Sequence, residues 1–260
     1  MIHIIIALVA FIISGCTHSP DLPQHNEVKC IGHRGDTSEQ LENSPASFLA
    51  ALNNNADGIE FDVRETADGT AIVMHDIDLS DVALSRPGKV CPIKTPINRL
   101  TFDEITNNCQ LKNGEDIPKL ETVLSTFQST NLFLLIEFKT NPGNNTLDLF
   151  NIYYTQNPEK IISIISFNID YNNAIETRDR FKTTTLLNRE VYQPDFYEIF
   201  DGVDVLDIAT VFIKRLQYEG KIISLYGINS LENTKEAFDL RAHYITTDNL
   251  QNCLAVKNET

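Results

Sequence analysis

Eight short apolar segments that alternate with helical patterns constrain the fold of this chain more than any other feature. They lie at 28–31, 57–63, 132–137, 161–167, 183–187, 203–206, 221–226 and 243–246. The segment 132–137 is almost continuously apolar, which is typical of a parallel strand buried on both faces. Eight strands with mostly helical crossovers predict an α/β fold of the (β/α)8 TIM barrel type, and 260 residues are enough to complete one.

A β-hairpin is predicted at the carboxyl-end rim of this barrel. Asp68-Gly69 is typical of a two-residue hairpin loop. If these two residues form the loop, counting outward along the arms places Asp62 directly opposite His75. Glu60 lies two positions before Asp62 on the strand, so both carboxylates point to the same face. The pattern therefore predicts a carboxylate pair and a histidine on one face of one ribbon.

A polar segment, residues 77–118, interrupts the alternation of strands and helices. It contains several prolines and glycines and little periodicity, apart from a short helix predicted at 101–109. We therefore expect residues 28–260 to form one barrel domain with a short insertion at about 77–118, over the rim. Other helices are predicted at 44–53, 120–129, 171–180, 209–218 and 230–239.

The first 15 residues are expected to be a signal peptide. Residues 4–13 form an apolar run too short for a comfortable membrane span, and Ile13-Ser14-Gly15-Cys16 resembles the bacterial lipoprotein cleavage box. Cys16 is then the acylated first mature residue, and 16–27 is a polar tether. This predicts a lipid-anchored protein of the bacterial cell envelope, on the periplasmic side of the outer membrane. An uncleaved anchor or a buried helix stays open, because no Lys or Arg precedes the apolar run.

Four further cysteines suggest disulfides in an exported protein. Cys91 and Cys109 lie in one local segment. Cys30 begins the first strand and Cys253 lies in the last helix, and these ends are neighbours in a closed barrel. Of the three possible connectivities we therefore favour Cys30–Cys253 with Cys91–Cys109. Four reduced thiols are the alternative.

Three carboxylates are predicted to meet at the carboxyl ends of two strands: Glu60, Asp62 and Glu137. Hard divalent cations prefer such oxygen donors, so the pattern predicts a site for one Ca²⁺ or Mg²⁺. The alternative is a salt-bridge cluster with three neighbouring cations, Arg34, Arg64 and Lys139.

Two histidines accompany these carboxylates. His33 and His75 suit a general base and a general acid near neutral pH. For either histidine alone a structural role would be the better interpretation, but their pairing near Asp62 favours catalysis. Arg34 and Lys139 are cations at the same barrel mouth and are predicted to hold phosphate oxygens, the arginine in a bidentate manner.

Charge and missing motifs exclude several classes of function. The formal net charge of −15 argues against nucleic-acid binding, which needs a basic surface. The sequence has no Gly-x-Ser-x-Gly nucleophile elbow and no P-loop, so hydrolases and nucleotide-binding motors of those kinds are not expected.

Several short motifs resemble, in order and spacing, those of glycerophosphodiester phosphodiesterases. They are His33-Arg34-Gly35, Glu42-Asn43-Ser44, Glu60-Phe61-Asp62-Val63, Asp68-Gly69, His75-Asp76, Ile117-Pro118-Lys119-Leu120-Glu121, Glu137-Phe138-Lys139, Ser166-Phe167 and Thr247-Asp248-Asn249. The resemblance covers about residues 28–253 and is stronger in the first half. It implies a TIM-type barrel, a Ca²⁺ or Mg²⁺ requirement, and hydrolysis of deacylated phospholipid head groups to glycerol 3-phosphate and an alcohol.

The resemblance also implies roles for single residues. The metal ligands would be Glu60, Asp62 and Glu137, the acid–base pair His33 and His75, the phosphate-binding cations Arg34 and Lys139, and a supporting residue Glu42. The family usually has a Trp-Thr-Val-Asn-like end to the penultimate strand, where this chain has Tyr226-Gly227-Ile228-Asn229. Tyr226 is expected to replace the aromatic wall that packs the glycerol, and the short insertion is expected to leave a more open pocket.

We therefore expect metal-dependent hydrolysis of a small-molecule glycerophosphodiester by histidine acid–base catalysis. Two other functions stay open. One is a phosphodiesterase that acts on intact lipids, such as a phospholipase D or a sphingomyelinase D. The other is a non-catalytic surface-binding lipoprotein.

Overall fold

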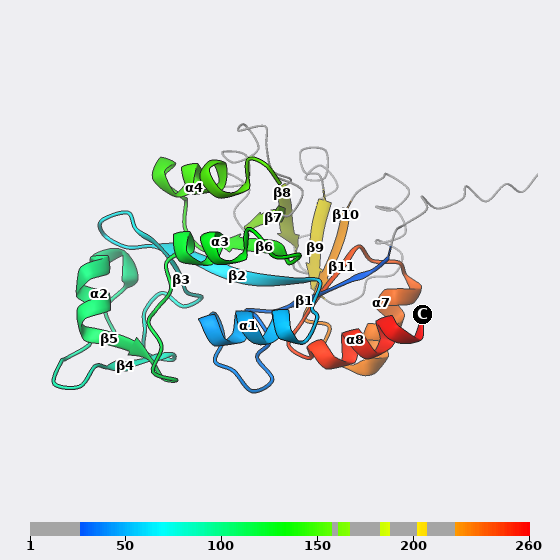
Figure 1. The fold of residues 1–260 in the computed structure, drawn as a ribbon, viewed down its shortest axis with the longest axis horizontal. Coiled ribbons are helices and arrows are strands. Elements are labelled where there is room, and N and C mark those ends of the chain that lie inside the picture. Colours follow the sequence, from blue (N-terminus) through cyan, green and yellow to red (C-terminus); the bar gives the residue numbers. More distant parts are fainter. Residues whose placement is uncertain (1–26, 158–160, 167–182, 188–201, 207–221) are drawn as a thin grey trace, which may run out of the picture.

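Eight parallel strands form a closed barrel at the centre of the molecule (Figure 1). The computed structural model describes residues 27–157, 161–166, 183–187, 202–206 and 222–260. The barrel strands are β1 (Lys29–Gly32), β2 (Gly58–Glu65), β6 (Phe133–Phe138), β7 (Ile161–Ser166), β8 (Thr183–Leu187), β9 (Gly202–Leu206), β10 (Ile222–Tyr226) and β11 (Tyr244–Thr247). The ring closes because β1 pairs in parallel with both β2 and β11. The predicted (β/α)8 barrel is therefore confirmed.

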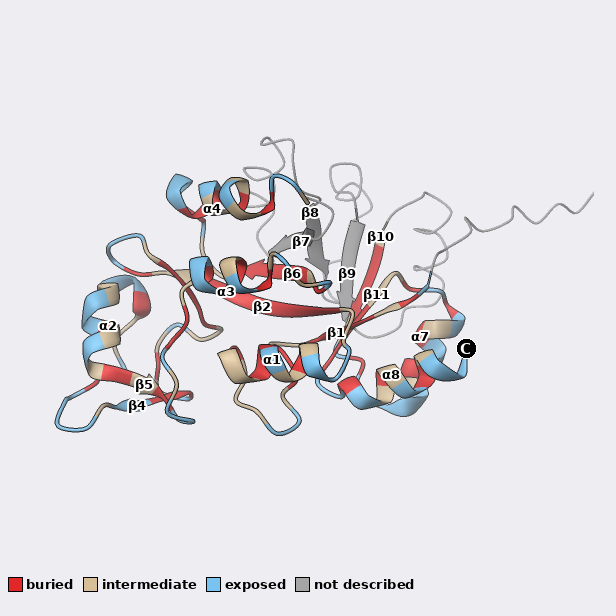
Figure 2. Ribbon diagram, in the orientation of Figure 1, coloured by how far each residue is buried: buried red, intermediate tan, exposed pale blue. Residues whose placement is uncertain are grey.

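Helices pack around the outside of this ring. They are α1 (Pro45–Asn53), α3 (Leu120–Phe127), α4 (Asn144–Tyr154), α7 (Leu231–Asp239) and α8 (Leu250–Glu259). Figure 2 shows their buried faces turned toward buried strands such as β2. The predicted helices at 44–53, 120–129 and 230–239 are present, whereas those predicted at 171–180 and 209–218 lie outside the described residues.

Helix α1 begins where local sequence signals predict. Ser44 is the N-cap, its hydroxyl accepts from the backbone N–H of Ser47, and Pro45 occupies the first turn. Phe48 is fully buried, and its ring centroid lies 5.7 Å from that of Phe61 in β2. This packing fixes the segment between β1 and α1 at the carboxyl-end rim of the barrel.

Helix α4 was not predicted from the sequence, and a distant residue caps it. Its N-cap residue, Gly143, has no side chain to offer. Instead Glu65, at the end of β2, accepts a hydrogen bond from the backbone N–H of Gly143 at 2.7 Å and another from the Thr146 hydroxyl. A carboxylate at a helix N-terminus is favourable, but here it comes from 78 residues earlier in the chain.

The predicted hairpin is present, but its predicted register is wrong by one residue. Strand β3 (Ala71–Val73) runs antiparallel to β2, and Val63 pairs with Val73. The backbone N–H of Met74 donates to the carbonyl of Asp62 at 2.9 Å, so Asp62 lies opposite Met74 and not His75. The loop has three residues, 67–69, because Gly69 adopts a φ of +74°, as in hairpins that end in a left-handed residue.

The insertion after the hairpin has a hydrophobic core of its own. It contains β4 (Ala83–Ser85), η1 (Ile97–Arg99), α2 (Phe102–Asn108) and β5 (Cys109–Leu111). In Figure 1, α2, β4 and β5 lie together at one end of the molecule. Its buried side chains cluster with Ile72 and Met74 of the hairpin rather than with the main core. The sequence predicted the short helix but missed this second core, because its apolar residues show little periodicity.

Both favoured disulfides are present. Cys30 is bonded to Cys253 and Cys91 to Cys109, so one bond ties β1 to α8 and the other lies within the insertion. Among the described residues no helix is both long and apolar enough to cross a membrane. Cys16 and the predicted signal peptide lie outside the described residues, so the lipid anchor stays a prediction.

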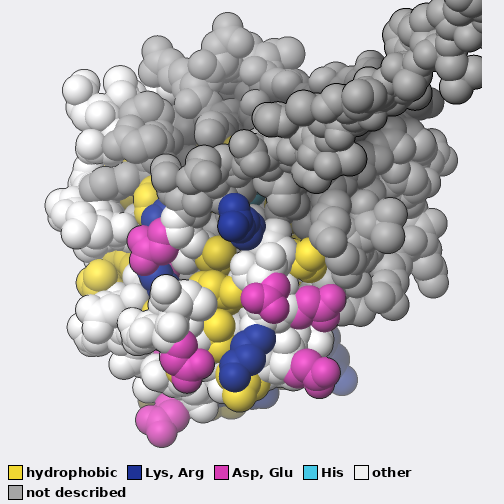
Figure 3. Space-filling model, turned by 90° about the vertical axis from the view of Figure 1, so that its right-hand side faces the viewer, with side chains coloured by type: hydrophobic (Ala, Val, Ile, Leu, Met, Phe, Trp, Pro, Cys, Tyr) yellow, Lys and Arg dark blue, Asp and Glu magenta, His cyan; other side chains and the backbone are white. Residues whose placement is uncertain are grey.

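The surface charges are mixed on the part of the molecule that Figure 3 displays. Lys and Arg side chains lie beside Asp and Glu there, with hydrophobic side chains between them. The net charge of −15 is therefore not gathered into a uniform acidic patch on this described surface.

Candidate active site

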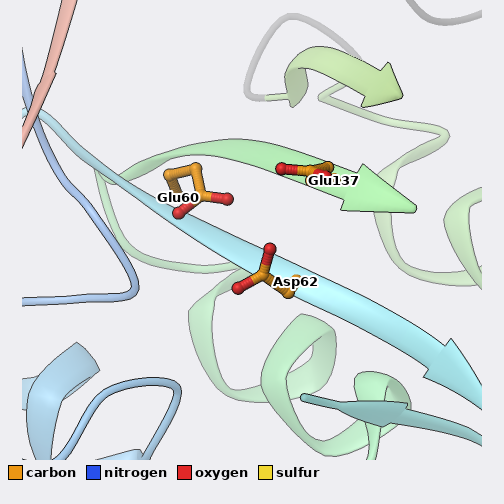
Figure 4. Close-up of side chains that lie close together, drawn as sticks. All are labelled: Glu60, Asp62 and Glu137. Carbon is orange, nitrogen blue, oxygen red and sulfur yellow. The ribbon is translucent and has the colours of Figure 1, made fainter. Parts of the chain in front are cut away.

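Three carboxylates converge at the carboxyl end of the barrel. Glu60 and Asp62 project from β2, Glu137 projects from β6, and the three side chains point toward one another (Figure 4). Asp62 and Glu137 are paired in register. One oxygen from each of the three carboxylates lies within 4.8 Å of the others, and the residues are 3, 1 and 7% exposed. The sequence-predicted metal ligands are thus brought together.

Burial of three acids in one place perturbs their pKa values. Burial, with the nearby charge of Asp62, raises the pKa of Glu60 to about 8. Burial also raises the pKa of Glu137, although Lys139 opposes it. Burial would raise the pKa of Asp62 as well, but the charges of Lys139 and Arg34 hold it below its ordinary value. An all-oxygen site this crowded with negative charge fits a hard divalent cation.

Two cations contact the same carboxylates. Lys139 Nζ lies 3.0 Å from Asp62 Oδ1 and also donates to Glu137. Arg34 Nε lies 3.3 Å from Asp62 Oδ2. The salt-bridge cluster that the sequence offered as an alternative is thus present for these two cations. Arg64 differs, because its Nε donates to the backbone carbonyl of His75 at 2.8 Å.

A tight turn after β1 positions Arg34. Gly35 has a φ of +91°, and a Cβ there would lie 2.3 Å from the Ser47 hydroxyl, so only glycine fits. Arg34 itself has a φ of +55°. Its backbone N–H donates to Glu60 Oε2 at 3.0 Å, and its guanidinium Nη1 donates to Glu42 Oε2 at 2.8 Å. Glu42 is therefore an ion-pair partner of Arg34.

The two histidines lie at the rim, each with a carboxylate on Nδ1. His33 Nδ1 is 2.6 Å from Asp248 Oδ1, and His33 Nε2 is 3.9 Å from Glu60 Oε2. Burial lowers the pKa of His33, but the hydrogen bond to Asp248 and the charge of Glu60 raise it above its ordinary value. His75 Nδ1 is 2.8 Å from Asp76 Oδ1. Both side chains are about one third exposed, at 31 and 33%, so a bound substrate can reach them.

His75 directly follows Met74, whose backbone N–H donates to the Asp62 carbonyl, so His75 lies one position beyond the residue opposite Asp62. Tyr226 lies at the end of β10 and packs against Ile31 and Leu135 inside the barrel. Its predicted contact with glycerol stays a prediction.

Sequence reasoning assigned no role to two residues that the structure places in the site. Asn43 is buried, donates from Nδ2 to Asp62 Oδ2 at 2.8 Å, and accepts from the backbone N–H of Asp62 at 3.2 Å. Asp248 holds His33. Both belong to motifs visible in the sequence, but their contacts are with residues far along the chain.

The chain is similar in sequence to glycerophosphodiester phosphodiesterases. The family model described as "Glycerophosphoryl diester phosphodiesterase family" matches residues 33–252. The chain is 30% identical to mouse glycerophosphodiester phosphodiesterase 1 over 140 residues, which is 51% of this chain and 40% of the mouse protein. The chain thus spans about two fifths of the length of that relative.

Solved structures with low sequence identity share the fold. Thermotoga maritima glycerophosphodiester phosphodiesterase has a TM-score of 0.70 at 23% identity, covering 90% of this chain and 99% of that chain. An Oleispira antarctica phosphodiesterase in complex with the product sn-glycerol-3-phosphate has a TM-score of 0.75 at 17% identity, covering 88 and 96%. From the family model and the barrel that carries its motifs, we conclude that this chain belongs to the glycerophosphoryl diester phosphodiesterase family.

Proposed function

We propose that this protein hydrolyses glycerophosphodiesters to glycerol 3-phosphate and an alcohol. The observation that carries the proposal is one buried carboxylate cluster that His33 and two cations, Arg34 and Lys139, approach within 4 Å. Family membership and the product bound to the Oleispira antarctica structure support the substrate class.

We further propose that Glu60, Asp62 and Glu137 hold one Ca²⁺ or Mg²⁺ ion. The donor set fits, because it consists of three buried carboxylates whose oxygens lie within 4.8 Å of one another. When bound, such an ion polarises a phosphoryl oxygen and neutralises developing charge.

The side chains of this chain bind the phosphate and move the protons. Arg34 and Lys139 supply N–H donors to phosphate oxygens. His33 Nε2 takes the proton from the nucleophile, which is either the neighbouring glycerol hydroxyl or water. His75 donates a proton to the leaving alcohol oxygen as the P–O bond breaks. If the glycerol hydroxyl attacks, the cyclic phosphate is then opened by water, and the two histidines exchange roles.

The test is alanine replacement of each histidine. His33→Ala and His75→Ala should each lower the turnover of glycerophosphocholine by roughly 10²–10⁴-fold, the usual contribution of a general acid or base. His25→Ala, in the predicted tether, is the matched control and should leave turnover unchanged. Near wild-type turnover in either active-site variant would refute the acid–base role proposed for the replaced histidine.

The same assay separates the alternative functions. Turnover of lysophospholipid or sphingomyelin in preference to glycerophosphocholine would indicate a phosphodiesterase of intact lipids. Absence of turnover on all three substrates, with or without added Ca²⁺ or Mg²⁺, would instead indicate a binding protein.

A further inference from the structure

Two sequence motifs without an assigned role meet beside His33. Asn229 follows β10, and Asp248 follows β11. Asn229 Nδ2 donates to Asp248 Oδ2 at 2.6 Å, and Asn229 Oδ1 accepts from the backbone N–H of Asp248 at 2.9 Å. The Thr247 hydroxyl also donates to Asn229 Oδ1, at 3.2 Å. The Asn229 amide therefore contacts both the backbone of Asp248 and one oxygen of its carboxylate.

The other oxygen of that carboxylate contacts the histidine. Asp248 Oδ1 lies 2.6 Å from His33 Nδ1. An ionised carboxylate only accepts hydrogen bonds, so the proton of this bond resides on Nδ1. The lone pair of the neutral imidazole is then on Nε2, the nitrogen that lies 3.9 Å from Glu60 Oε2 in the carboxylate cluster.

The Asp248 side chain needs a contact that holds it beside His33, because it is half exposed. Its side chain is 49% exposed and would gain hydration by rotating away from His33. The backbone of His33 is tied to the same place, since its N–H donates to the carbonyl of Thr247 at 3.0 Å. Asn229 thus supplies the contact that keeps the carboxylate turned inward.

We propose that Asn229 and Asp248 are positioning residues for His33: Asn229 orients the Asp248 carboxylate, which fixes the Nδ1–H tautomer and directs Nε2 at the substrate. The inference rests on the proposed function for its kinetic part, because His33 must be the group that moves the proton. The assignment of the His33 tautomer depends only on the hydrogen bonds among His33, Asp248 and Asn229.

The decisive variant is Asp248→Asn. The Nδ2 of Asn229 requires an oxygen facing it, so the new amide must turn its NH₂ group toward His33 Nδ1. That donor favours the opposite tautomer, with the proton on Nε2. We expect kcat to fall by roughly 10²–10³-fold, within the range for loss of a general base, with KM changed less than threefold.

Two further variants separate positioning from simple structural damage. Asp248→Glu keeps an accepting carboxylate and should recover at least tenfold in kcat over Asp248→Asn. In the double variant Asp248→Asn with Asn229→Ala, the amide introduced at position 248 is free to turn its oxygen toward His33. Because the two neighbouring side chains are coupled, kcat should be about tenfold higher than in Asp248→Asn alone. Asp239→Asn, an exposed position of α7, is the matched control and should keep wild-type kinetics.

The tautomer is read directly by ¹⁵N NMR of the imidazole. Wild type should carry the proton on Nδ1 of His33, and Asp248→Asn should carry it on Nε2. Retention of the Nδ1–H tautomer in Asp248→Asn, or a kcat within twofold of wild type, would overturn the inference. If wild type itself turns over no glycerophosphodiester, the proposed function fails, while the NMR comparison still decides whether Asp248 sets the tautomer.

Discussion

Replacing Asn43 should destabilise the protein strongly, because this side chain is a buried partner of Asp62. Asn43 is 4% exposed and Asp62 is 1% exposed, so solvent does not screen their interaction. Asn43→Gly removes a hydrogen bond to a charged group, typically worth about 1.5–3 kcal/mol, and leaves the buried N–H of Asp62 unpaired, which costs roughly 1–3 kcal/mol more. We expect a loss of about 3–5 kcal/mol in the free energy of unfolding.

The backbone of Asn43 adds a second effect. Its φ of +53° is tolerated by asparagine and glycine but is strained for alanine. Asn43→Ala should therefore be less stable than Asn43→Gly by roughly 1 kcal/mol. The difference between these two variants isolates the backbone contribution from the lost hydrogen bonds.

Urea denaturation with the disulfides intact measures both effects. Asn145→Ala, an exposed asparagine in the first turn of α4, is the matched control and should change the free energy of unfolding by less than about 0.5 kcal/mol. A loss below about 1 kcal/mol in Asn43→Ala would refute the reasoning, because it would mean that Asp62 finds equivalent partners without Asn43.

Two further predictions concern the carboxylate cluster and the insertion. Since the pKa of Glu60 is raised from 4.5 to about 8 in the folded state, folded Glu60 keeps its proton where unfolded Glu60 has lost it. Glu60 therefore makes the metal-free protein less stable as pH rises through that interval. Bound Ca²⁺ or Mg²⁺ should raise Tm more at pH 8 than at pH 5; an equal rise at both pH values would contradict this. Replacing Cys91 and Cys109 together by serine opens a disulfide with a sequence separation of 18 residues, which should cost about 3 kcal/mol and expose the insertion to limited proteolysis before the barrel. Cleavage that begins in the barrel would argue against a separately stabilised insertion.

Much of the barrel could be predicted from the sequence because its signals are local. The near-continuous apolar run before Glu137 indicates a buried parallel strand, and Ser44-Pro45 marks the start of α1. Glu60, Asp62 and Glu137 follow from the rule that barrels place polar residues at carboxyl strand ends. These carboxylates converge because the two strands that carry them, β2 and β6, are neighbours in the barrel.

The hairpin register differs from the prediction because it depends on the length of a single loop. Asp68-Gly69 is compatible with a two-residue or a three-residue hairpin loop. The left-handed Gly69 ends a three-residue loop, and as a result Met74 lies opposite Asp62. Helix α4 was missed because its capping carboxylate, Glu65, lies on another element. The core of the insertion was missed because its apolar residues have no regular period.

Local sequence patterns are enough to predict the eight barrel strands, the helix start at Ser44 and the polar residues at the strand ends. These depend on patterns of hydrophobicity and on capping residues within about a dozen positions. Which of those residues contact one another depends on the tertiary structure. Asn43 reaches Asp62 across 19 positions and Asp248 reaches His33 across 215, and such hydrogen bonds arise only when closure of the barrel brings β1, β2 and β11 side by side.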